Sequence, residues 1–324
     1  MLGVGKISVS SMAAVDSFHL LYREVARSCQ NHLEFLAVVG ALYTARKGLC
    51  ILYDCYSLLR LHVTPCLLSK KDLVQHYGEW AVVTGATNSI GKAYAEELAK
   101  CGLNIILICS KRDQLHNVSE AITRTYGVNT NFIDVDFSQG QEVYPSIREA
   151  LRNLDVGILV NNAGVFDENP ERIVEIPEDK VWDTIHVNVA SAVMMAHIVL
   201  PGMVEKKRGA IVNVISGSAG KSDSQTAASK AYLETFSRQL GSDMSSSGIF
   251  VQCLTPLYVG SKSSSSSGIL PMFAPSPDVY VHHAVRTLGF STRTTGYWAH
   301  SLQLLACRWI PGWLCGSIGT FLQQ

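Results

Sequence analysis

The chain contains, between two apolar segments, the glycine-rich sequence Thr84-Gly85-Ala86-Thr87-Asn88-Ser89-Ile90-Gly91. The segment before it, residues 80–83, is a short apolar run. The segment after it, residues 92–100, carries apolar residues at helical spacing. A glycine-rich turn between a buried strand and a helix lets the backbone approach a phosphate closely and aims the helix N-terminus at its charge. The sequence therefore predicts a strand–turn–helix unit that binds phosphate.

Beyond this turn, short apolar runs alternate with longer helical segments. Further strands are expected at residues 104–108, 131–135, 157–160, 210–215 and 250–254. Further helices are expected at residues 112–126, 142–151, 182–199 and 227–244. Apolar runs of four to six residues between helices of nine or more indicate a parallel sheet with helices on both faces. We therefore expect an α/β fold built on a doubly wound parallel sheet.

The composition bounds the class of protein. The 324 residues suit one large domain with an appendage, and 47% of them are apolar. Lys and Arg number 27, as do Asp and Glu, so no excess positive field favours a nucleic-acid partner. The nine cysteines are scattered without a CxxC pair, which is typical of reduced thiols. We expect neither a disulfide framework nor a metal site.

The N-terminal region, residues 1–65, has a different character. Residues 1–30 resemble a weakly amphipathic helix, and apolar runs follow at residues 35–43 and 48–59. Arg46-Lys47 separates the runs, and neither reaches the ~18–20 uninterrupted apolar residues of a spanning helix. A membrane-associated hairpin and an amphipathic docking helix both stay open, and a spanning helix is less favoured. Pro65 and the polar residues 69–72 place the boundary, so we expect an apolar helical appendage over 1–65 and the α/β domain over 66–324.

Further motifs follow the glycine-rich turn in order along the chain. They are Asp136 after the third strand, Asn161-Asn162-Ala163-Gly164 after the fourth, Asn188 in the long helix, Ser216 after the fifth strand, Ser229-Lys230 in the next helix, and Pro256 with Val259 after the sixth strand. In type and order these motifs resemble the short-chain dehydrogenase/reductase family over residues 79–260. The resemblance implies a Rossmann fold that holds a dinucleotide.

The resemblance also assigns roles to individual residues. The implied cofactor-binding residues are Gly85, Ser89, Ile90, Gly91, Ser110, Lys111, Asp136, Asn162, Ala163, Gly164, Lys230, Pro256 and Val259. The family has a glycine where this chain has Ser89, and the serine Cβ intrudes where the phosphate approaches. We therefore expect weakened cofactor binding.

The end of the second strand bears on the choice of cofactor. Sites that prefer NAD place a carboxylate there to bind the ribose 2′-hydroxyl. This chain has Ser110-Lys111-Arg112 instead. Two cations without a carboxylate suit a 2′-phosphate and favour NADP. The alternative is a solvated basic start to the following helix.

The catalytic group of the family is incomplete. By resemblance the tetrad would be Ser216, Thr226, Lys230 and Asn188, with Thr226 at the position of the family's tyrosine. A threonine hydroxyl is much less acidic than a phenol and stops on the order of 5 Å short of the phenol oxygen. We therefore expect no usable general acid at this position.

The spacing around the threonine departs from the family as well. Ser216 precedes Thr226 by ten positions where the family has thirteen, so the loop is expected to be three residues short. Asn213 stands thirteen positions back, but using it would shift the strand by an odd number and turn Val212 outward. Among possible substitutes, Tyr232 is expected in the core, and Tyr258 is the better candidate.

Within the family, the chain is similar to the hydroxysteroid dehydrogenase-like group, near the 17β-hydroxysteroid dehydrogenases (type 3-like) and 3-ketoacyl reductases. Residues 13–24, 91–98, 155–162 and 294–298 carry this similarity. It implies an inactive, membrane-associated protein of the mitochondrion, with the endoplasmic reticulum membrane as the alternative. The leading hypothesis is a pseudoenzyme that binds NADP weakly and acts through binding or a protein partner, with homo-oligomers left open. The alternative is a slow NADP-dependent carbonyl reductase acting on a steroid or 3-ketoacyl lipid.

Overall fold

The structure is a computed structural model that describes residues 8–64, 72–165, 172–215, 224–260 and 272–309. The chain divides into two compact units, residues 1–57 and residues 58–324. The first unit consists of most of a single long helix. The second holds the sheet, its covering helices and all the motifs named above.

In the described part of the chain, the sheet of the second unit has seven parallel strands in the order β3-β2-β1-β4-β5-β6-β7. The strands are β1 (Trp80–Thr84), β2 (Asn104–Cys109), β3 (Thr130–Asp134), β4 (Val156–Asn161), β5 (Gly209–Val214), β6 (Ile249–Leu254) and β7 (Arg293–Thr294). The strand order reverses between β1 and β4, which creates a crevice at the carboxyl ends of the strands where doubly wound proteins bind their ligands. The expected doubly wound α/β fold is confirmed.

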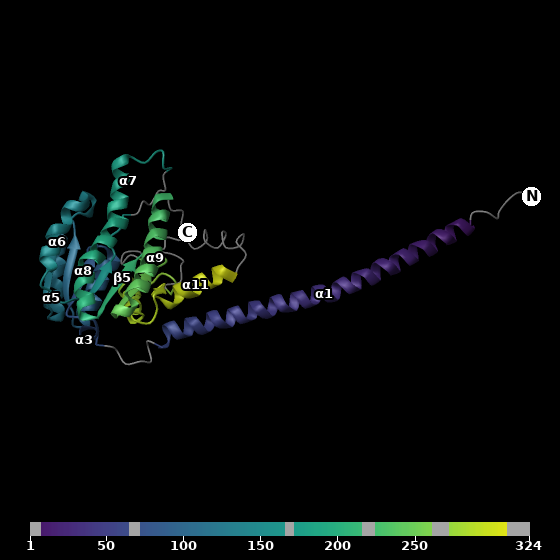
Figure 1. Cartoon of the computed structure of the whole chain (residues 1–324), viewed down its shortest axis with the longest axis horizontal. Coiled ribbons are helices and arrows are strands. Elements are labelled where there is room, and N and C mark those ends of the chain that lie inside the picture. Colours follow the sequence, from purple (N-terminus) through teal and green to yellow (C-terminus); the bar gives the residue numbers. More distant parts are fainter. Residues whose placement is uncertain (1–7, 65–71, 166–171, 216–223, 261–271, 310–324) are drawn as a thin grey trace, which may run out of the picture. The chain divides into compact units, whose positions relative to one another are not determined.

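Helices cover both faces of this sheet (Figure 1). They are α3 (Leu73–Tyr77), α4 (Ser89–Lys100), α5 (Arg112–Tyr126), α6 (Tyr144–Leu151), α7 (Glu178–Ile185), α8 (Ser191–Lys206), α9 (Ser224–Met244), α10 (Pro277–Arg286) and α11 (Trp298–Trp309), with short 3₁₀ segments at Phe137–Val143 and Ser245–Ser247. The long helix expected at 182–199 is divided into α7 and α8 by the π-helical segment His186–Ala190.

Alternation along the strands explains the two layers. Val83 and Val160 point to a core shared with α4, α5 and α10, whereas Val82 and Leu159 point to a core shared with α6 and α8. Because successive side chains of a strand face opposite sides, a strand buried on both faces reads as a continuous apolar run. This is why the runs in the sequence located the strands.

The N-terminal helix α1 (Ser8–His62) is continuous through the region where the sequence left a hairpin open. The hairpin interpretation is therefore wrong. No proline occurs before Pro65, and Arg46 and Lys47 are good helix formers, so nothing in this region terminates a helix.

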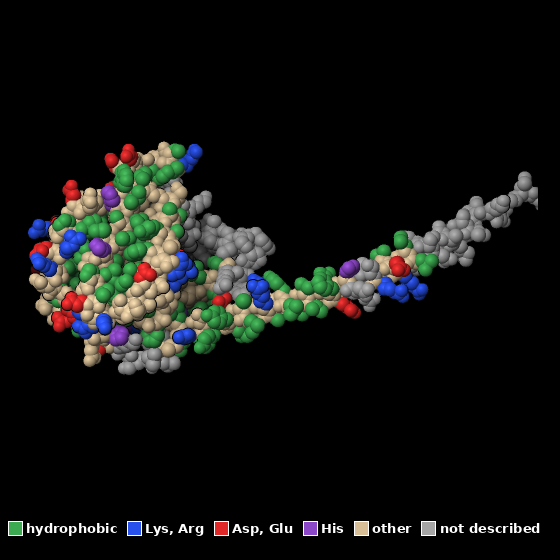
Figure 2. Space-filling model, viewed as in Figure 1, with side chains coloured by type: hydrophobic (Ala, Val, Ile, Leu, Met, Phe, Trp, Pro, Cys, Tyr) green, Lys and Arg blue, Asp and Glu red, His purple; other side chains and the backbone are tan. Residues whose placement is uncertain are grey.

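Apolar side chains on α1 are widely exposed, as Figure 2 shows along the helix. Over residues 20–62 the helix has a window of mean hydropathy 1.5 with no buried residues, so it is long and apolar enough to cross a membrane. The second described helix that meets these criteria, Glu178–Lys206, is partly buried in the core of the sheet domain. The two helices therefore differ in what their apolar surface meets.

Candidate functional site

The glycine-rich turn joins the end of β1 to the start of α4. Gly85 has a φ of +63°, and a Cβ on it would lie 3.0 Å from the backbone of Ala163. A Cβ on Gly91 would lie 2.6 Å from Asn162 Nδ2 and closer still to the Gly85 carbonyl oxygen. Both positions therefore require glycine, the first for its left-handed backbone and both for close packing.

The loop after β4 is bound directly to this turn. Asn162 Nδ2 donates to the Gly85 carbonyl at 3.1 Å. The buried Thr84 hydroxyl accepts from the backbone amides of Asn162 at 3.0 Å and Ala163 at 3.1 Å. The two loops that would floor a dinucleotide thus form one hydrogen-bonded unit. Thr84 was assigned no role of its own from the sequence, although it is the first residue of the glycine-rich stretch.

The start of α4 is suited to a phosphate. Asn88 is the N-cap residue, yet its side chain forms no capping hydrogen bond with the described residues. Ser89, the first helical residue, is exposed. Backbone amides in the first turn of a helix lack internal partners, and together with the helix dipole they attract anions. The residues present therefore fit a pyrophosphate at this position.

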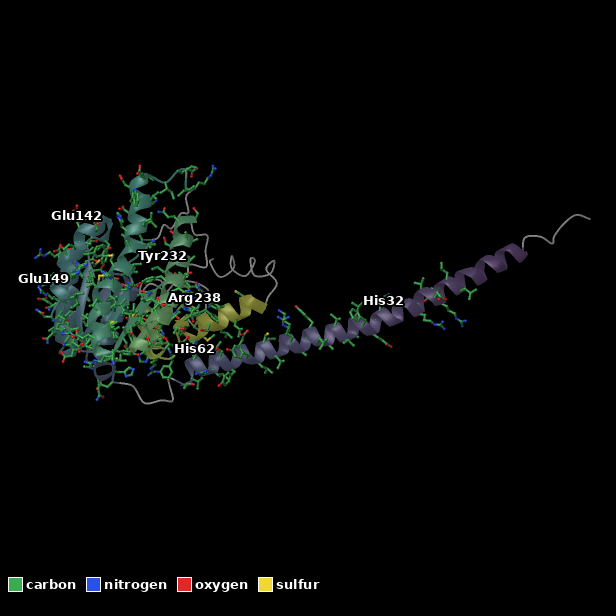
Figure 3. All side chains as sticks on the ribbon, in the orientation of Figure 1. His32, His62, Glu142, Glu149, Tyr232 and Arg238 are labelled. Carbon is green, nitrogen blue, oxygen red and sulfur yellow. The ribbon has the colours of Figure 1, made fainter. Side chains whose placement is uncertain are left out.

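A cavity of about 510 Å³ lies beyond the ends of β2 and β3. It contains Ser110 and Asp136, both assigned to the cofactor by resemblance, together with Asp134 and Glu142 (labelled in Figure 3). The Asp136 carboxylate accepts from the backbone amide of Ser138 at 3.0 Å and so caps the following 3₁₀ segment. The cavity can receive the adenosine half of a dinucleotide, with a carboxylate-rich wall.

The two cations after β2 lie outside the lining of this cavity. Lys111 and Arg112 are exposed, and neither forms a salt bridge with a carboxylate in the described ranges. Lys111 is also the N-cap residue of α5 without a side-chain capping bond. Both ammonium and guanidinium groups are therefore available to an added anion.

The chemistry-bearing residues lie on other elements. Thr226 and Lys230 are one turn apart on α9; the threonine is buried, at 6% exposure, and the lysine is half-buried. Asn188 lies in the π-helical segment, where its side chain accepts from Val165 N at 2.8 Å and donates to Val165 O at 3.0 Å. Asn188 therefore holds the described start of the loop after Gly164. Ser216 lies outside the described residues.

Asn213 has a structural role in the sheet, and β5 keeps the register that excludes this residue from the site. It is fully buried on β5 beside Asn161 of β4, and the Asn161 side chain donates to its oxygen at 2.8 Å. Its own amide donates to the Ser237 hydroxyl at 2.8 Å. Val212 stays in the core at 1% exposure, so β5 is not shifted to bring Asn213 into the site. This series of buried hydrogen bonds, which runs from β4 through β5 to α9, was not predicted from the sequence.

The two tyrosines considered as substitutes are both on the surface. Tyr232 is 48% exposed and stacks on Phe236 at 6.3 Å between ring centroids, so the core assignment was wrong. Two residues after Lys230, it turns to the solvent face of α9, where Figure 3 labels it. Tyr258 is 58% exposed.

The loop after β6 carries the last assigned residues. Pro256 is buried and Val259 is half-buried. The backbone of the residues between them is bound by His300 of α11: Leu257 N donates to Nδ1 at 3.4 Å, and Nε2 donates to the Tyr258 carbonyl at 3.1 Å. His300 was not singled out from the sequence. A lone histidine in an apolar helix gave no signal of a partner 42 residues earlier.

Comparisons with known proteins agree with this geometry. The family model described as short chain dehydrogenase matches residues 79–268. The Homo sapiens protein named inactive hydroxysteroid dehydrogenase-like protein 1 is 56% identical over 309 residues, which cover 94% of each chain. The very-long-chain 3-oxoacyl-CoA reductase of Anas platyrhynchos is 40% identical and covers 84% of this chain and 86% of its own. A short-chain dehydrogenase from Sphingobium yanoikuyae, solved in complex with NADPH, has a TM-score of 0.58 at 25% identity, covering 76% of this chain and 95% of its own.

Proposed function

Because the chain belongs to the short-chain dehydrogenase family, we propose that it is a catalytically inactive member that keeps a dinucleotide pocket and acts through binding or partner contacts. The observation that carries this proposal is Thr226, a buried threonine one helical turn before Lys230. The name of the 56%-identical human relative, which includes the word inactive, supports the same reading.

The physical reason is the loss of a proton donor. In a phenol one turn before a lysine, the ammonium lowers a pKa of about 10 toward the working pH, which makes the phenol a usable general acid. An aliphatic hydroxyl cannot be adjusted in this way. Loss of a general acid typically costs ~10²–10⁴ in rate. Tyr232 does not replace it, because it lies on the solvent face of α9 and stacks on Phe236.

The test is NADPH oxidation by the full chain with a panel of ketosteroids and 3-ketoacyl substrates. A 3-oxoacyl-CoA reductase serves as the positive control. We expect NADPH binding, measured by calorimetry, without turnover above background. Robust turnover would replace the proposal by the NADP-dependent reductase of a steroid or acyl lipid. Absence of any dinucleotide binding would remove the pocket from the proposal.

NADP is the proposed dinucleotide. Among the described residues, neither Lys111 nor Arg112, which follow Ser110, has an ion-pair partner. Asp134 and Glu142 in the cavity wall oppose an added phosphate. With Ser89 at the start of α4, weak binding that favours NADPH over NADH is expected. Lys111→Ala should weaken NADPH binding and leave NADH binding unchanged. Equal losses for both would assign Lys111 no part in the 2′-phosphate site.

Membrane association through α1 is proposed as well. Side chains such as Phe35, Val38 and Leu42 are exposed to solvent on this helix, and burying them in a lipid acyl region would remove that apolar area from water. Placing charged side chains in the acyl region costs free energy unless they reach the lipid headgroups, and this applies to Arg46, Lys47 and Asp54.

Membrane fractionation tests this proposal. The full chain should resist carbonate extraction, and paired Val38→Glu and Leu42→Glu substitutions should release it. The control is removal of residues 1–65. If that truncated chain stays with membranes as fully as the whole chain does, the anchor lies elsewhere, for example in the tail from Trp309 to Phe321.

We propose the mitochondrion as the location, on the strength of the family resemblance, with the endoplasmic reticulum membrane as the alternative. Fractionation against markers of both membranes separates the two. A protein partner or a second copy of the chain would be the natural effector of a non-catalytic protein. Cross-linking of the membrane-bound full chain, with and without NADPH, tests for both.

A further inference from the structure

The loop after β6 is fixed at three successive points. At its start, Thr255 N donates to the Thr294 carbonyl of β7 at 2.9 Å. At Gly260, where the described part of this loop stops, the backbone amide donates to the Pro275 carbonyl at 3.0 Å. Between them, the ring of His300 serves one amide and one carbonyl of adjacent residues, Leu257 and Tyr258. The middle anchor is supplied by a side chain of another element, α11.

A neutral imidazole is suited to this task because it has one acceptor and one donor on opposite edges of the ring. His300 is fully buried. Burial lowers its pKa to about 4, although the carbonyls of Tyr258 and Phe273 act in the opposite direction. The rings of Tyr280 and Tyr297, at centroid distances of 5.7 and 5.3 Å, fix the ring plane. At neutral pH the side chain therefore keeps a single charge state and orientation.

The position of the loop says which part of a dinucleotide it meets. The turn at Gly85 and the cavity at Ser110 lie over β1, β2 and β3, on one side of the point where the strand order reverses. A dinucleotide lies across that point at the carboxyl ends of the strands. Its other half must then lie over β4, β5 and β6, and the loop from Thr255 to Gly260 follows β6 directly.

We propose that His300 is a positioning residue for the nicotinamide half of the dinucleotide site. It acts from α11 by holding the backbone of Leu257 and Tyr258, not by touching the cofactor. This inference rests on the proposed dinucleotide pocket. It goes beyond that pocket in assigning a role to a helix that follows all of the family motifs.

The experiment compares two ligands on the full chain. NADPH engages both halves of the site, and 2′,5′-ADP engages the adenosine half alone. For His300→Ala, which leaves an amide and a carbonyl without partners, we expect NADPH binding to weaken by about tenfold. Binding of 2′,5′-ADP should change by less than about twofold. His300→Gln keeps one acceptor and one donor and should recover part of the loss.

Ser301→Ala is the matched control. Ser301 is the next residue on α11, and its hydroxyl contacts His62 Nε2 at 2.9 Å and Thr295 Oγ1 at 2.6 Å instead of the loop. It should leave the ratio of the two affinities unchanged. Equal weakening of both ligands by His300→Ala, or an equal change in the ratio for Ser301→Ala, would reduce His300 to a general packing residue.

The unaltered protein gives a second, independent test. Hydrogen exchange of the amides at 257–260 should slow on addition of NADPH and stay the same on addition of 2′,5′-ADP. Slowing by both ligands, or by neither, would overturn the inference while the pocket stands. If the unaltered protein binds neither ligand, it is the proposed function that fails.

Discussion

The ligand-binding edge of the sheet has two halves, and they differ in how many of the family's functional groups they keep. On the side of β1 and β4, the turn at Gly85, the helix start at Gly91 and the loop at Asn162 form one tightly packed unit. On the side of β5 and α9, Lys230 and Asn188 are present, but the residue one turn before the lysine is Thr226. The dinucleotide half, at β1 and β4, keeps its packed turn. The catalytic half, at β5 and α9, lacks the tyrosine that donates the proton in the family.

The difference shows that binding and catalysis depend on different kinds of residue. In the dinucleotide half, the backbone at Gly85 and Gly91 packs closely against neighbouring backbone and side chains, and this packing is also part of the fold. A larger residue at either glycine would therefore disturb the packing of α4 on the sheet. The phenol of the family tyrosine serves the substrate. A buried threonine can occupy its position while α9 keeps its place in the domain. Catalysis can therefore be absent from an intact scaffold.

The largest effect should come from rebuilding the catalytic half. We predict that Thr226→Tyr alone restores little NADPH-dependent ketone reduction, because Thr226 is buried and the family resemblance implies a preceding loop that is three residues short. Displacement on the order of 1 Å can already cost about 10²-fold. Inserting three residues before position 226 together with the tyrosine should exceed either change alone by ~10²–10⁴. Steady-state rates on a ketosteroid panel measure this, and strong activity of the single variant would show the short loop to be harmless.

Disturbing the dinucleotide half should have the next largest effect. In Gly91→Ala the new Cβ would meet Asn162 Nδ2 at 2.6 Å and the Gly85 backbone, so we predict a loss of about 1–3 kcal/mol in the free energy of unfolding and at least tenfold weaker NADPH binding. Gly202→Ala on α8 is the matched control, because a Cβ there meets nothing within 4 Å. It should be neutral or stabilising by up to ~1 kcal/mol. Chemical denaturation and calorimetry of both variants decide the matter.

A third substitution, at Asp155, affects the edge of the sheet opposite the ligand-binding edge. Asp155, before β4, binds Lys206 Nζ and accepts from Arg208 Nη2 at 2.9 Å. Burial opposes ionisation of Asp155, but the Lys206 hydrogen bond and the charges of Lys206 and Arg208 outweigh it and hold the pKa below its ordinary value of 3.8. Asp155→Asn should therefore lower stability at pH 7 by about 1–3 kcal/mol and leave NADPH affinity unchanged.

The pH dependence of that loss follows from the direction of the shift. A carboxyl whose pKa is lower in the folded state stabilises the fold above pH 3.8, and the contribution disappears as the pH falls through the folded value. The stability difference between the unaltered protein and Asp155→Asn should thus shrink as unfolding is measured from pH 6 toward pH 3. A constant difference over that range would mean that charge is not the source of the loss.

The smallest effect concerns the start of α4. Ser89→Gly should tighten NADPH binding by a few-fold, because it removes the Cβ from the approach of the phosphate. Calorimetry on the two proteins measures the change. Unchanged or weaker binding would argue against the steric effect of Ser89. It would mean that the helix start at Asn88 is accessible to the phosphate with the serine in place.

Some features of this site were legible in the sequence because they follow from local rules. The alternation of short apolar runs with helices located the strands, and the glycine-rich turn located the crevice between β1 and β4. The odd register shift that using Asn213 would need correctly kept that residue out of the site. The absence of the tyrosine before Lys230 needed only the one-turn spacing of a helix.

Other features could not be predicted from the local sequence pattern, because they depend on how the elements pack or on where a helix ends. The surface position of Tyr232 depends on which face of α9 meets the sheet. The breaks expected in the N-terminal region came from interruptions in hydropathy, but α1 is continuous because a helix ends at a backbone signal and not at a charge.

By itself, the sequence determined the doubly wound sheet, the position of the dinucleotide turn and the loss of the phenol. These rest on periodicity, on the backbone freedom of glycine and on fixed spacing along one helix. The tertiary structure alone decided the contacts of Thr84 with the loop after β4, the buried chain from Asn161 through Asn213 to Ser237, and the grip of His300 on Leu257 and Tyr258. Each joins groups far apart in the chain, and a buried polar atom finds its partner only when the packing of the whole domain brings the two together.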